Sequence, residues 1–376
     1  MSQRGTTSGR HIVLTAGGTG GHLFPALSLA EALISRGDRV TIITDERGRR
    51  FQEDSKSADY KIRIVKISSP TGNLWHKLKC AVSLLKGYLH ARRLLGKDKP
   101  DAVIGFGGYP SFPIMLAAQH LKICNIIHEQ NAVIGKANLA IARKADFIAI
   151  SLPHIAGLSS REEEKKVVYT GNPVRSEIQK LSGLGYPVLR TDEPFNILVL
   201  GGSQGASVFG EVVPEALNRL PAHEKKRLYV VQQCREEDLQ TTRQAFDNAG
   251  ISHEVRSFFN DIPERLRAAH LVISRSGAST VAEVTAAGRP AIFVPYPWHK
   301  DQQQKMNADV VADNGGAWVM AQNGFTPKAL EAKLMILLQD PSVLEKAAEK
   351  SRECAVTDAA EKLADLARSK TSTSQI

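Results

Sequence analysis

A glycine-rich loop near the start of the chain, Gly17 to His22, contains the first residues whose types suggest chemistry. It follows an apolar run, His11–Ala16, that we predict to be a strand, and it opens a predicted helix. Glycines here let the backbone turn sharply and approach a ligand, while the helix start presents free N–H groups. The imidazole of His22 suits a general base because its pKa is near neutrality. The plain alternatives are a tight turn without a ligand and a histidine that only packs or caps the helix.

The dinucleotide-binding pattern G-x-G-x-x-G is not matched by this loop. Gly18 and Gly20 fit the pattern, but Leu23 stands where the third glycine belongs. A second glycine loop, 201–205, follows another predicted strand and includes Ser203, whose hydroxyl suits a phosphate. Two such loops in one chain favour a nucleotide-binding protein more than either loop does alone.

The polar segment that says most about function is 275–283, which follows an apolar predicted strand. It opens the predicted helix Val281–Ala287, which Gly288 and Pro290 end. Small and hydroxyl-bearing residues at a helix N-terminus make an anion site that suits a diphosphate. Glu283, one turn into this helix, is placed to reach the hydroxyls of an attached ribose, or it only favours the helix dipole.

Further polar clusters follow predicted strands at 105–110, 128–131, 171–175 and 299–307. The amides of the last cluster suit sugar hydroxyls or form a solvated helix start. In open parallel sheets, ligands bind beyond the carboxyl ends of the strands, so we expect these residues from both halves of the chain to face one cleft. The sequence has no Asp-x-Asp pair and no carboxylate cluster that would hold a metal with a nucleotide diphosphate. We therefore predict no metal and no cofactor.

Apolar strand-like runs alternate with helical segments along the whole chain, which is typical of doubly wound parallel α/β sheets. Each glycine loop follows the first strand of its half, so we predict two Rossmann-like domains. The expected boundaries are a tail over 1–10, an N-terminal domain over 11–178, a linker over 179–194, a C-terminal domain over 195–350, a helix over 351–368 that packs on the first domain, and a tail over 369–376.

The 376-residue chain has a formal net charge of +10. Such a charge suits nucleic acid, an anionic membrane surface or a phosphorylated substrate. Aromatic residues are only 6% of the chain and no stretch resembles a nucleic-acid-binding motif, so we predict the membrane surface and the phosphorylated substrate. Four scattered cysteines, no signal peptide and no apolar run of about 18 residues predict a cytoplasmic protein.

The segment Trp75–Leu95 has helical spacing, with a basic stripe and a separate apolar face that includes Val82, Leu85 and Leu89. A basic amphipathic helix of this kind lies on an anionic bilayer, and an ordinary helix that covers a sheet has the same periodicity. Spacing alone leaves both alternatives open.

Taken together, seven of these motifs resemble the bacterial cell-wall N-acetylglucosaminyltransferases, which join N-acetylglucosamine to a lipid-linked muramyl-pentapeptide. The motifs occur in order over nearly the whole chain, at 17–26, 105–110, 128–131, 171–175, 201–206, 275–283 and 299–307. The resemblance implies a GT-B fold, in which two Rossmann-like domains face an interdomain cleft. It also implies an inverting transfer from UDP-N-acetylglucosamine to the 4-hydroxyl of undecaprenyl-diphosphate-N-acetylmuramyl-pentapeptide, by a peripheral protein at the cytoplasmic face of the membrane.

The same resemblance implies site residues. His22 is the first candidate for the catalytic base and Glu129 the second. Cell-wall and division proteins are candidate partners. One departure is the run Gln232–Arg235, which stands where the family has His-Gln-Ser/Thr-Gly and puts in doubt the contact expected there. The implied contacts to the donor are Thr19, Gly20, Gly21, Asn131, Arg175, Ser203, Phe259, Ala278, Ser279, Thr280, Val281, Ala282, Glu283 and Gln304.

Three other functions fit the residues taken by themselves. The first is a GT-B transferase with another acceptor. The second is a nucleotide-sugar or dinucleotide-binding protein without catalysis. The third, suggested by charge alone, is a nucleic-acid binder. Acceptor specificity, donor turnover and salt-sensitive retention on DNA or RNA separate these functions.

Overall fold

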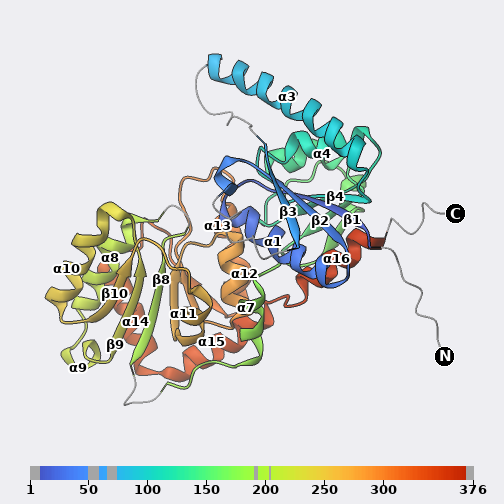
Figure 1. Ribbon diagram of the computed structural model, residues 1–376. Coiled ribbons are helices and arrows are strands. Elements are labelled where there is room, and N and C mark those ends of the chain that lie inside the picture. The colour runs from blue at the N-terminus through green and yellow to red at the C-terminus, as the bar shows by residue number, and fades with distance from the viewer. Residues whose placement is uncertain (1–8, 50–58, 66–73, 190–193, 203–204, 370–376) are drawn as a thin grey trace, which may run out of the picture. The chain divides into compact units, whose positions relative to one another are not determined.

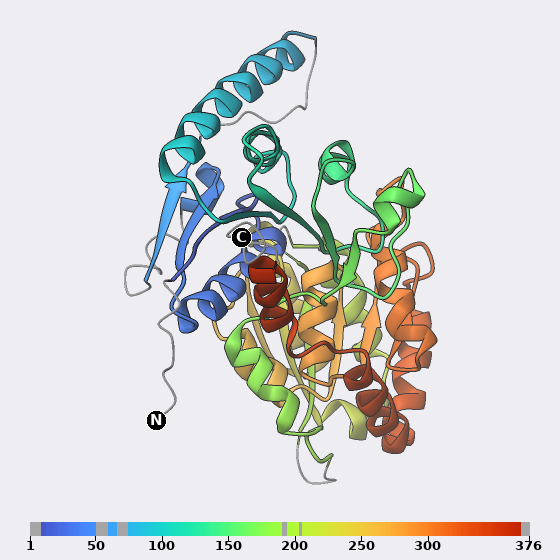
Figure 2. The same cartoon turned by 90° about the vertical axis from the view of Figure 1, so that its right-hand side faces the viewer.

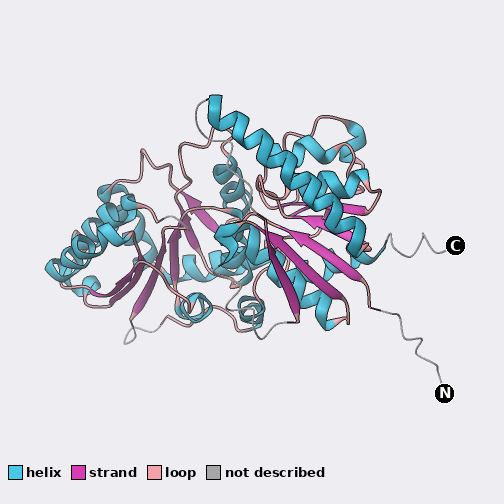
Figure 3. Cartoon of the chain, turned by 45° about the horizontal axis from the view of Figure 1, so that its top comes forward, coloured by secondary structure: helices cyan, strands magenta, loops and turns pink. Residues whose placement is uncertain are grey.

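The computed structural model describes residues 9–49, 59–65, 74–189, 194–202 and 205–369. The chain divides into two compact units. The first comprises Met1–Arg175 together with Asp358–Ile376, and the second comprises Ser176–Thr357. Each unit is a parallel sheet with helices packed on its faces, as Figures 1 and 3 show. The prediction of two doubly wound, Rossmann-like α/β domains is confirmed.

The central strands of the first unit's sheet are near-continuous apolar runs, as expected for strands that are covered on both faces. All seven strands are parallel, and the order along the sheet reverses between β1 and β4. Ligands bind at the carboxyl edge of such a sheet where the order reverses. In spatial order the strands are β3 (Tyr60–Ile64), β2 (Arg39–Thr44), β1 (His11–Thr15), β4 (Ala102–Gly105), β5 (Cys124–Glu129), β6 (Phe147–Ile150) and β7 (Val167–Tyr169).

Helices pack on both faces of this sheet. Ile12 and Leu14 of β1 belong to a buried core with α1 (Gly20–Ser35) and α16 (Ala359–Ser369). Val13 points to the other core, which includes residues of three further helices. Those helices are α3 (Leu74–Asp98), α4 (Phe112–His120) and α5 (Lys136–Ala142). The described part of the unit also contains η1 (Glu46–Arg49) and α6 (Arg161–Glu164).

The C-terminal helix α16 belongs to the first unit because its apolar face packs on α1. Leu363, Ala364 and Ala367 are fully buried there. The sequence placed one helix over 351–368, but α15 (Pro341–Glu353) ends before residue 354, and α16 begins at Ala359. The break is needed because α15 packs within the second unit and α16 packs within the first.

The second unit repeats the same plan, with six parallel strands whose order reverses between β8 and β11. The strand β13 was not predicted, because three residues after Gly315 and Gly316 carry too little pattern. In spatial order the strands are β10 (Ser252–Arg256), β9 (Leu228–Gln233), β8 (Phe195–Leu200), β11 (Leu271–Ser274), β12 (Ala291–Phe293) and β13 (Ala317–Val319).

The helices of the second unit cover both faces of its sheet. The helix predicted over 281–287 begins earlier, at Ala278, and Gly288 after its end has a φ of +61°, as expected for a glycine stop. The helices are α7 (Ser176–Gln179), η3 (Lys180–Gly183), α8 (Ser207–Asn218), α9 (Ala222–Lys225), η4 (Glu236–Asp238), α10 (Leu239–Ala249), α11 (Ile262–Ala268), α12 (Ala278–Ala286), α13 (Gln303–Asp313), α14 (Pro327–Gln339) and α15.

The segment for which the sequence predicted a linker, 179–194, is attached to the second unit over much of its described length. Tyr186 donates a hydrogen bond from its hydroxyl to the carbonyl of His270 at 2.9 Å. The buried guanidinium of Arg289 donates to the carbonyl of Gly185 at 3.0 Å. Of the predicted tails, residues 1–8 and 370–376 lie outside the described residues.

The long helix α3 is amphipathic, as its spacing predicted. Its inward side, which includes Ala91 and Leu95, joins the core next to α4. Val82, Leu85 and Leu89 face outward and are exposed by 46%, 59% and 49%. Figure 2 shows the first half of α3 standing away from the body of its unit. None of the helices in the described ranges combines the length and apolar character needed to cross a bilayer.

Candidate functional site

In the first unit, the loops after β1 and β4 meet at the point where the strand order reverses. The N–H of Gly17 donates to the carbonyl of Gly107 at 3.2 Å. Gly107 and Gly108 have φ angles of +83° and +78°, which side chains other than glycine rarely adopt. A Cβ atom on Gly108 would also lie 3.2 Å from Cα of Gly17. The glycines therefore allow two main chains to pass closely at the carboxyl edge of the sheet.

His22 lies between these two loops. Its Nδ1 shares a hydrogen bond of 2.9 Å with the hydroxyl of Thr19, the residue that precedes α1. A Cβ on Gly107 would lie 3.5 Å from Nε2, so the missing side chain leaves room for the imidazole. Burial, with a smaller contribution from Arg47, lowers the pKa of His22 to about 4, and Asp45 opposes the shift. The imidazole is therefore neutral at physiological pH.

Glu129, at the end of β5, is buried and accepts four hydrogen bonds. One oxygen accepts from the N–H and the side-chain amide of Asn131, at 3.1 and 3.2 Å. The other accepts from the N–H of Gly135 at 2.9 Å and the side-chain amide of Asn138 at 2.8 Å. Burial raises the pKa of Glu129, and these four donors oppose the rise. The carboxylate therefore holds the loop 129–138 together.

Arg175, at the end of the first unit, lies against the start of α1. The centre of its guanidinium is 4.9 Å from the ring centroid of Phe24. A Cβ on Gly20 would lie 2.9 Å from the same ring, so glycine permits this packing. Five predicted site residues therefore gather around the first turns of α1: Thr19, Gly20, Gly21, His22 and Arg175.

In the second unit, the start of α12 is held to the start of α13. The hydroxyl of Ser276 donates to the carbonyl of Gln304 at 2.8 Å, and the buried amide of Asn307 donates to the carbonyl of Ser276 at 3.1 Å. The N–H of Tyr296 donates to Oε1 of Gln304 at 2.9 Å. These bonds place Gln304 beside the first turn of α12, which contains Ala278, Ser279 and Thr280.

The start of α12 has the properties of an anion site. Gly277 precedes the helix in an extended conformation, and the first N–H groups of a helix have no partner within it. Val281, Ala282 and Glu283 complete the segment, with Ala282 and Glu283 only partly buried. Arg275, just before it, donates to the carbonyls of Val294 and Pro295, and burial lowers its pKa.

Phe259 lies in a different place, in the turn after the edge strand β10. Its ring is buried, and the centre of the Arg265 guanidinium is 4.3 Å from the ring centroid. Three strand spacings, about 14 Å, separate β10 from β11, whose end leads into α12. Ser203 lies outside the described residues, so its predicted contact has no structural account.

Two residues that sequence reasoning missed act on the predicted ones. Arg47 pairs with Asp45 at 2.6 Å and contributes to the lowered pKa of His22. The sequence feature that could have identified Arg47 is its charged pair with Asp45, which directly follows β2 and lies beside the first glycine loop. Asn138 binds Glu129 from the first turn of α5. Nothing in its spacing pointed to Glu129, because the contact depends on the path of the loop. Within the parts of the chain described, no three or more His, Cys, Asp and Glu residues form a metal-binding group.

The chain matches one family over both units. Residues 12–150 match the N-terminal domain of glycosyltransferase family 28, and residues 196–363 match its C-terminal domain. The chain belongs to glycosyltransferase family 28. It is an enzyme with two Rossmann-like domains of the GT-B type.

Several relatives that share one name make the family assignment more specific. A UDP-N-acetylglucosamine--N-acetylmuramyl-(pentapeptide) pyrophosphoryl-undecaprenol N-acetylglucosamine transferase of Rhodospirillum centenum is 48% identical over 94% of this chain and 93% of its own length. A protein of the same name from Zymomonas mobilis is 45% identical over 95% of this chain and 92% of its own. The crystal structure of MurG from Acinetobacter baumannii has a TM-score of 0.75 and 32% identity, and covers 96% of this chain and 99% of that one. The chain therefore also belongs to the family that carries this transferase name.

Proposed function

We propose that this glycosyltransferase moves N-acetylglucosamine from UDP-N-acetylglucosamine to the 4-hydroxyl of undecaprenyl-diphosphate-N-acetylmuramyl-pentapeptide, with inversion at the anomeric carbon. The observation that carries the proposal is the 48% identity, over nearly full length, to a transferase named for this donor and acceptor. The geometry of both sheets agrees, because a helix start that suits a phosphorylated ligand follows a strand in each of them, at α1 in the first unit and at α12 in the second.

The donor's position follows from the second unit. The diphosphate lies at the start of α12, where N–H groups and the helix dipole stabilise negative charge. The base lies near Phe259, and about 14 Å of sheet edge between β10 and β11 accommodates the nucleoside. Glu283 binds the ribose and Gln304 binds the sugar through its Nε2, because its Oε1 accepts from Tyr296. Further donor contacts come from Thr19, Gly20, Gly21, Asn131, Arg175, Ser203 and the segment Ala278–Ala282.

The catalytic step uses His22 as the base. In the tautomer that this role requires, Nδ1–H donates to the hydroxyl of Thr19, with which it shares a hydrogen bond, and the lone pair is on Nε2. The acceptor's 4-hydroxyl attacks the anomeric carbon opposite UDP, the new C–O bond forms as the bond to the diphosphate breaks, and the proton passes to Nε2. The start of α12 stabilises the departing diphosphate electrostatically. One inversion needs no covalent intermediate.

The lipid-linked acceptor requires a membrane, and α3 is the proposed contact at the cytoplasmic face. Its exposed residues Val82, Leu85 and Leu89 form an apolar stripe, and Lys86 and Arg93 are exposed on the same helix. An apolar face flanked by cations inserts into the boundary of an anionic bilayer. The association is peripheral, and cell-wall or division proteins are candidate partners there.

A transfer assay tests the proposed function. Purified protein is mixed with labelled UDP-N-acetylglucosamine and a short-chain analogue of the lipid-linked muramyl-pentapeptide, and the disaccharide product is isolated. We expect a β-1,4-linked disaccharide from this donor and much slower transfer from UDP-N-acetylgalactosamine. Donor hydrolysis without transfer, or transfer only to an unrelated acceptor, would refute the assignment.

A further inference from the structure

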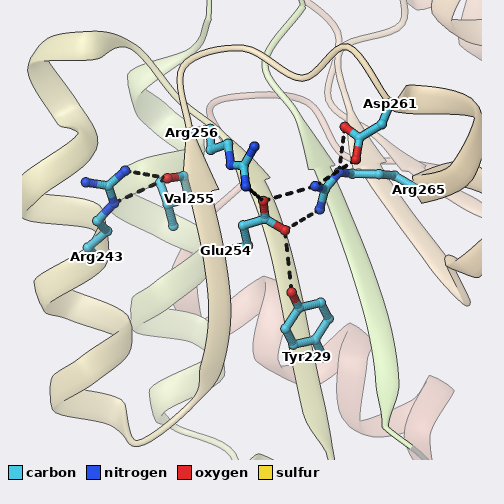
Figure 4. Close-up of polar contacts among 7 residues, drawn as sticks. All are labelled: Tyr229, Arg243, Glu254, Val255, Arg256, Asp261 and Arg265. Carbon is cyan, nitrogen blue, oxygen red and sulfur yellow. Dashed lines mark hydrogen bonds and ion pairs between the residues drawn. The ribbon is translucent and has the colours of Figure 1, made fainter.

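The turn between β10 and α11, residues 257–261, is braced by a cluster of charged side chains on the elements that flank it (Figure 4). Arg265 of α11 lies at the centre of the cluster. Its guanidinium binds Glu254 of β10 at 2.5 and 3.0 Å. It also binds Asp261, the residue before α11, at 2.9 to 3.1 Å. One side chain therefore ties the end of the strand to the start of the helix.

The same guanidinium covers the buried side chain of the turn. Its centre is 4.3 Å from the ring centroid of Phe259, and that of Arg256 is 5.9 Å from the same ring. Phe259 is only 4% exposed, whereas Phe258 beside it is 69% exposed. The cation over the ring therefore fixes which of the two phenylalanines points inward, and with it the direction of the peptide group between them.

A further bond fixes the path by which the chain enters the turn. The side-chain amide of Gln233, on β9, donates to the carbonyl of Ser257 at 3.2 Å. Glu254 also pairs with Arg256 at 2.6 Å, so the carboxylate is held by two arginines. Arg265 and Glu254 are 13% and 21% exposed, so water screens their interaction less than it screens a surface pair.

Within this fixed turn, polar main-chain groups are left for a ligand. Neither the N–H nor the C=O of Phe259 bonds to another described residue. The main chain of one residue offers one donor and one acceptor, and uracil presents an acceptor oxygen, O4, beside a donor, N3–H. Cytosine reverses this order, with a donor amine at the same place. A main-chain donor and acceptor that cannot shift along the base edge therefore distinguish the two pyrimidines.

We propose that Arg265, braced by Glu254 and Asp261, is a positioning residue that sets the nucleobase specificity of the donor site by holding the main chain at Phe259 in register with uracil. Arg265 touches no ligand in this assignment. The inference rests on the proposed function, because it takes the donor to be a uridine nucleotide. It adds that preference for uracil is determined by side chains behind the turn.

The test compares binding of UDP and CDP by calorimetry for the full-length protein and for Arg265→Met. We expect the variant to bind UDP about tenfold more weakly, which is the size of one lost hydrogen bond of about 1.4 kcal/mol. Affinity for CDP should change much less, so the ratio of the two dissociation constants should fall. Inhibition by inorganic pyrophosphate, which reports the start of α12, should be unchanged.

Arg243→Met is the matched control. Arg243 donates to the carbonyl of Val255, at 2.7 and 3.2 Å, and so binds the same strand without reaching the turn (Figure 4). This variant should lose stability but keep the UDP to CDP ratio. If Arg265→Met does not fold, Arg265→Lys and Glu254→Gln provide the same comparison, since each weakens the two-point contact while keeping size.

The outcomes separate the two proposals. If Arg265→Met leaves the UDP to CDP ratio unchanged, Arg265 has only a structural role, whatever happens to stability. If UDP and pyrophosphate weaken equally, the loss is general and the positioning role is likewise overturned. If the unaltered protein binds no UDP, the proposed function itself fails, and this result is visible before any variant is made.

Discussion

The imidazole of His22 should give the reaction an unusual dependence on pH. Burial and Arg47 lower its pKa from 6.5 to about 4, so the neutral, proton-accepting form persists well below neutrality. Because the base acts in its neutral form, activity is lost as the pH falls through the folded-state pKa. We therefore expect the acid limb of kcat/KM near pH 4 to 5 rather than near 6.5. An acid limb at 6.5 would contradict either the lowered pKa of His22 or its role.

Substitution of His22 separates catalysis from binding. His22→Ala should lower kcat by about 10²- to 10⁴-fold, the usual contribution of a positioned general base. UDP affinity, measured by calorimetry, should change little, because the diphosphate is assigned to α12. Thr19→Val is a useful companion, since it removes the hydroxyl that orients the ring while leaving the imidazole in place. Unchanged turnover in His22→Ala would remove this residue as the base.

Glu129, the second candidate for the base, is better explained as a positioning residue. Glutamine accepts at one oxygen only, so Glu129→Gln leaves either Asn131 or the pair Gly135 and Asn138 facing an amide instead of an acceptor. We expect kcat/KM to fall about tenfold or more, with the acid limb of the pH profile unmoved. Loss of that limb in Glu129→Gln would instead identify Glu129 as the base.

Only part of the site could be predicted from the sequence alone. The glycine loops and the polar strand ends were predictable, because parallel sheets bring strand ends to one edge. The partners of Glu129 were not, because Asn138 reaches it only through the path of the loop 129–138. The low pKa of His22 was also missed, since it depends on burial and on Arg47, and neither appears in the spacing.

At the scale of elements, a buried side chain and an exposed ion pair of α16 should contribute very differently to the free energy of unfolding. Leu363 is fully buried against the core that includes α1, so Leu363→Ala should lower the free energy of unfolding by about 2–5 kcal/mol. Asp365 pairs with Arg36 at 2.5 Å, but its side chain is 73% exposed. Asp365→Ala should therefore cost less than about 1 kcal/mol. Denaturant unfolding of both variants checks the order, and equal losses would contradict it.

Element boundaries were predictable wherever a local signal exists. Gly288 ends α12 because its φ of +61° suits glycine, and the apolar runs gave the long strands to within a few residues. The division of the last helical segment between α15 and α16 was not predictable. Both pieces have a helical pattern, and only their packing in different units separates them.

At the scale of the whole molecule, the net charge of +10 and the exposed apolar stripe on α3 together predict binding to anionic membranes. Binding to vesicles that contain anionic lipid should weaken as salt rises from about 50 to about 500 mM, because the screening length falls roughly threefold over this range. Leu85→Glu should abolish most of the binding, because it places a charge in the apolar stripe.

A control variant separates membrane contact through α3 from attraction by net charge alone. Ile336→Glu is the control: Ile336 is 55% exposed on α14 of the second unit, so this substitution adds the same charge away from α3. If α3 is the contact, Ile336→Glu retains most of the vesicle binding while Leu85→Glu loses it. If both variants lose binding equally, net charge alone drives the association. Since the transfer assay uses a short-chain acceptor, Leu85→Glu should keep full activity there and lose it only with acceptor embedded in vesicles.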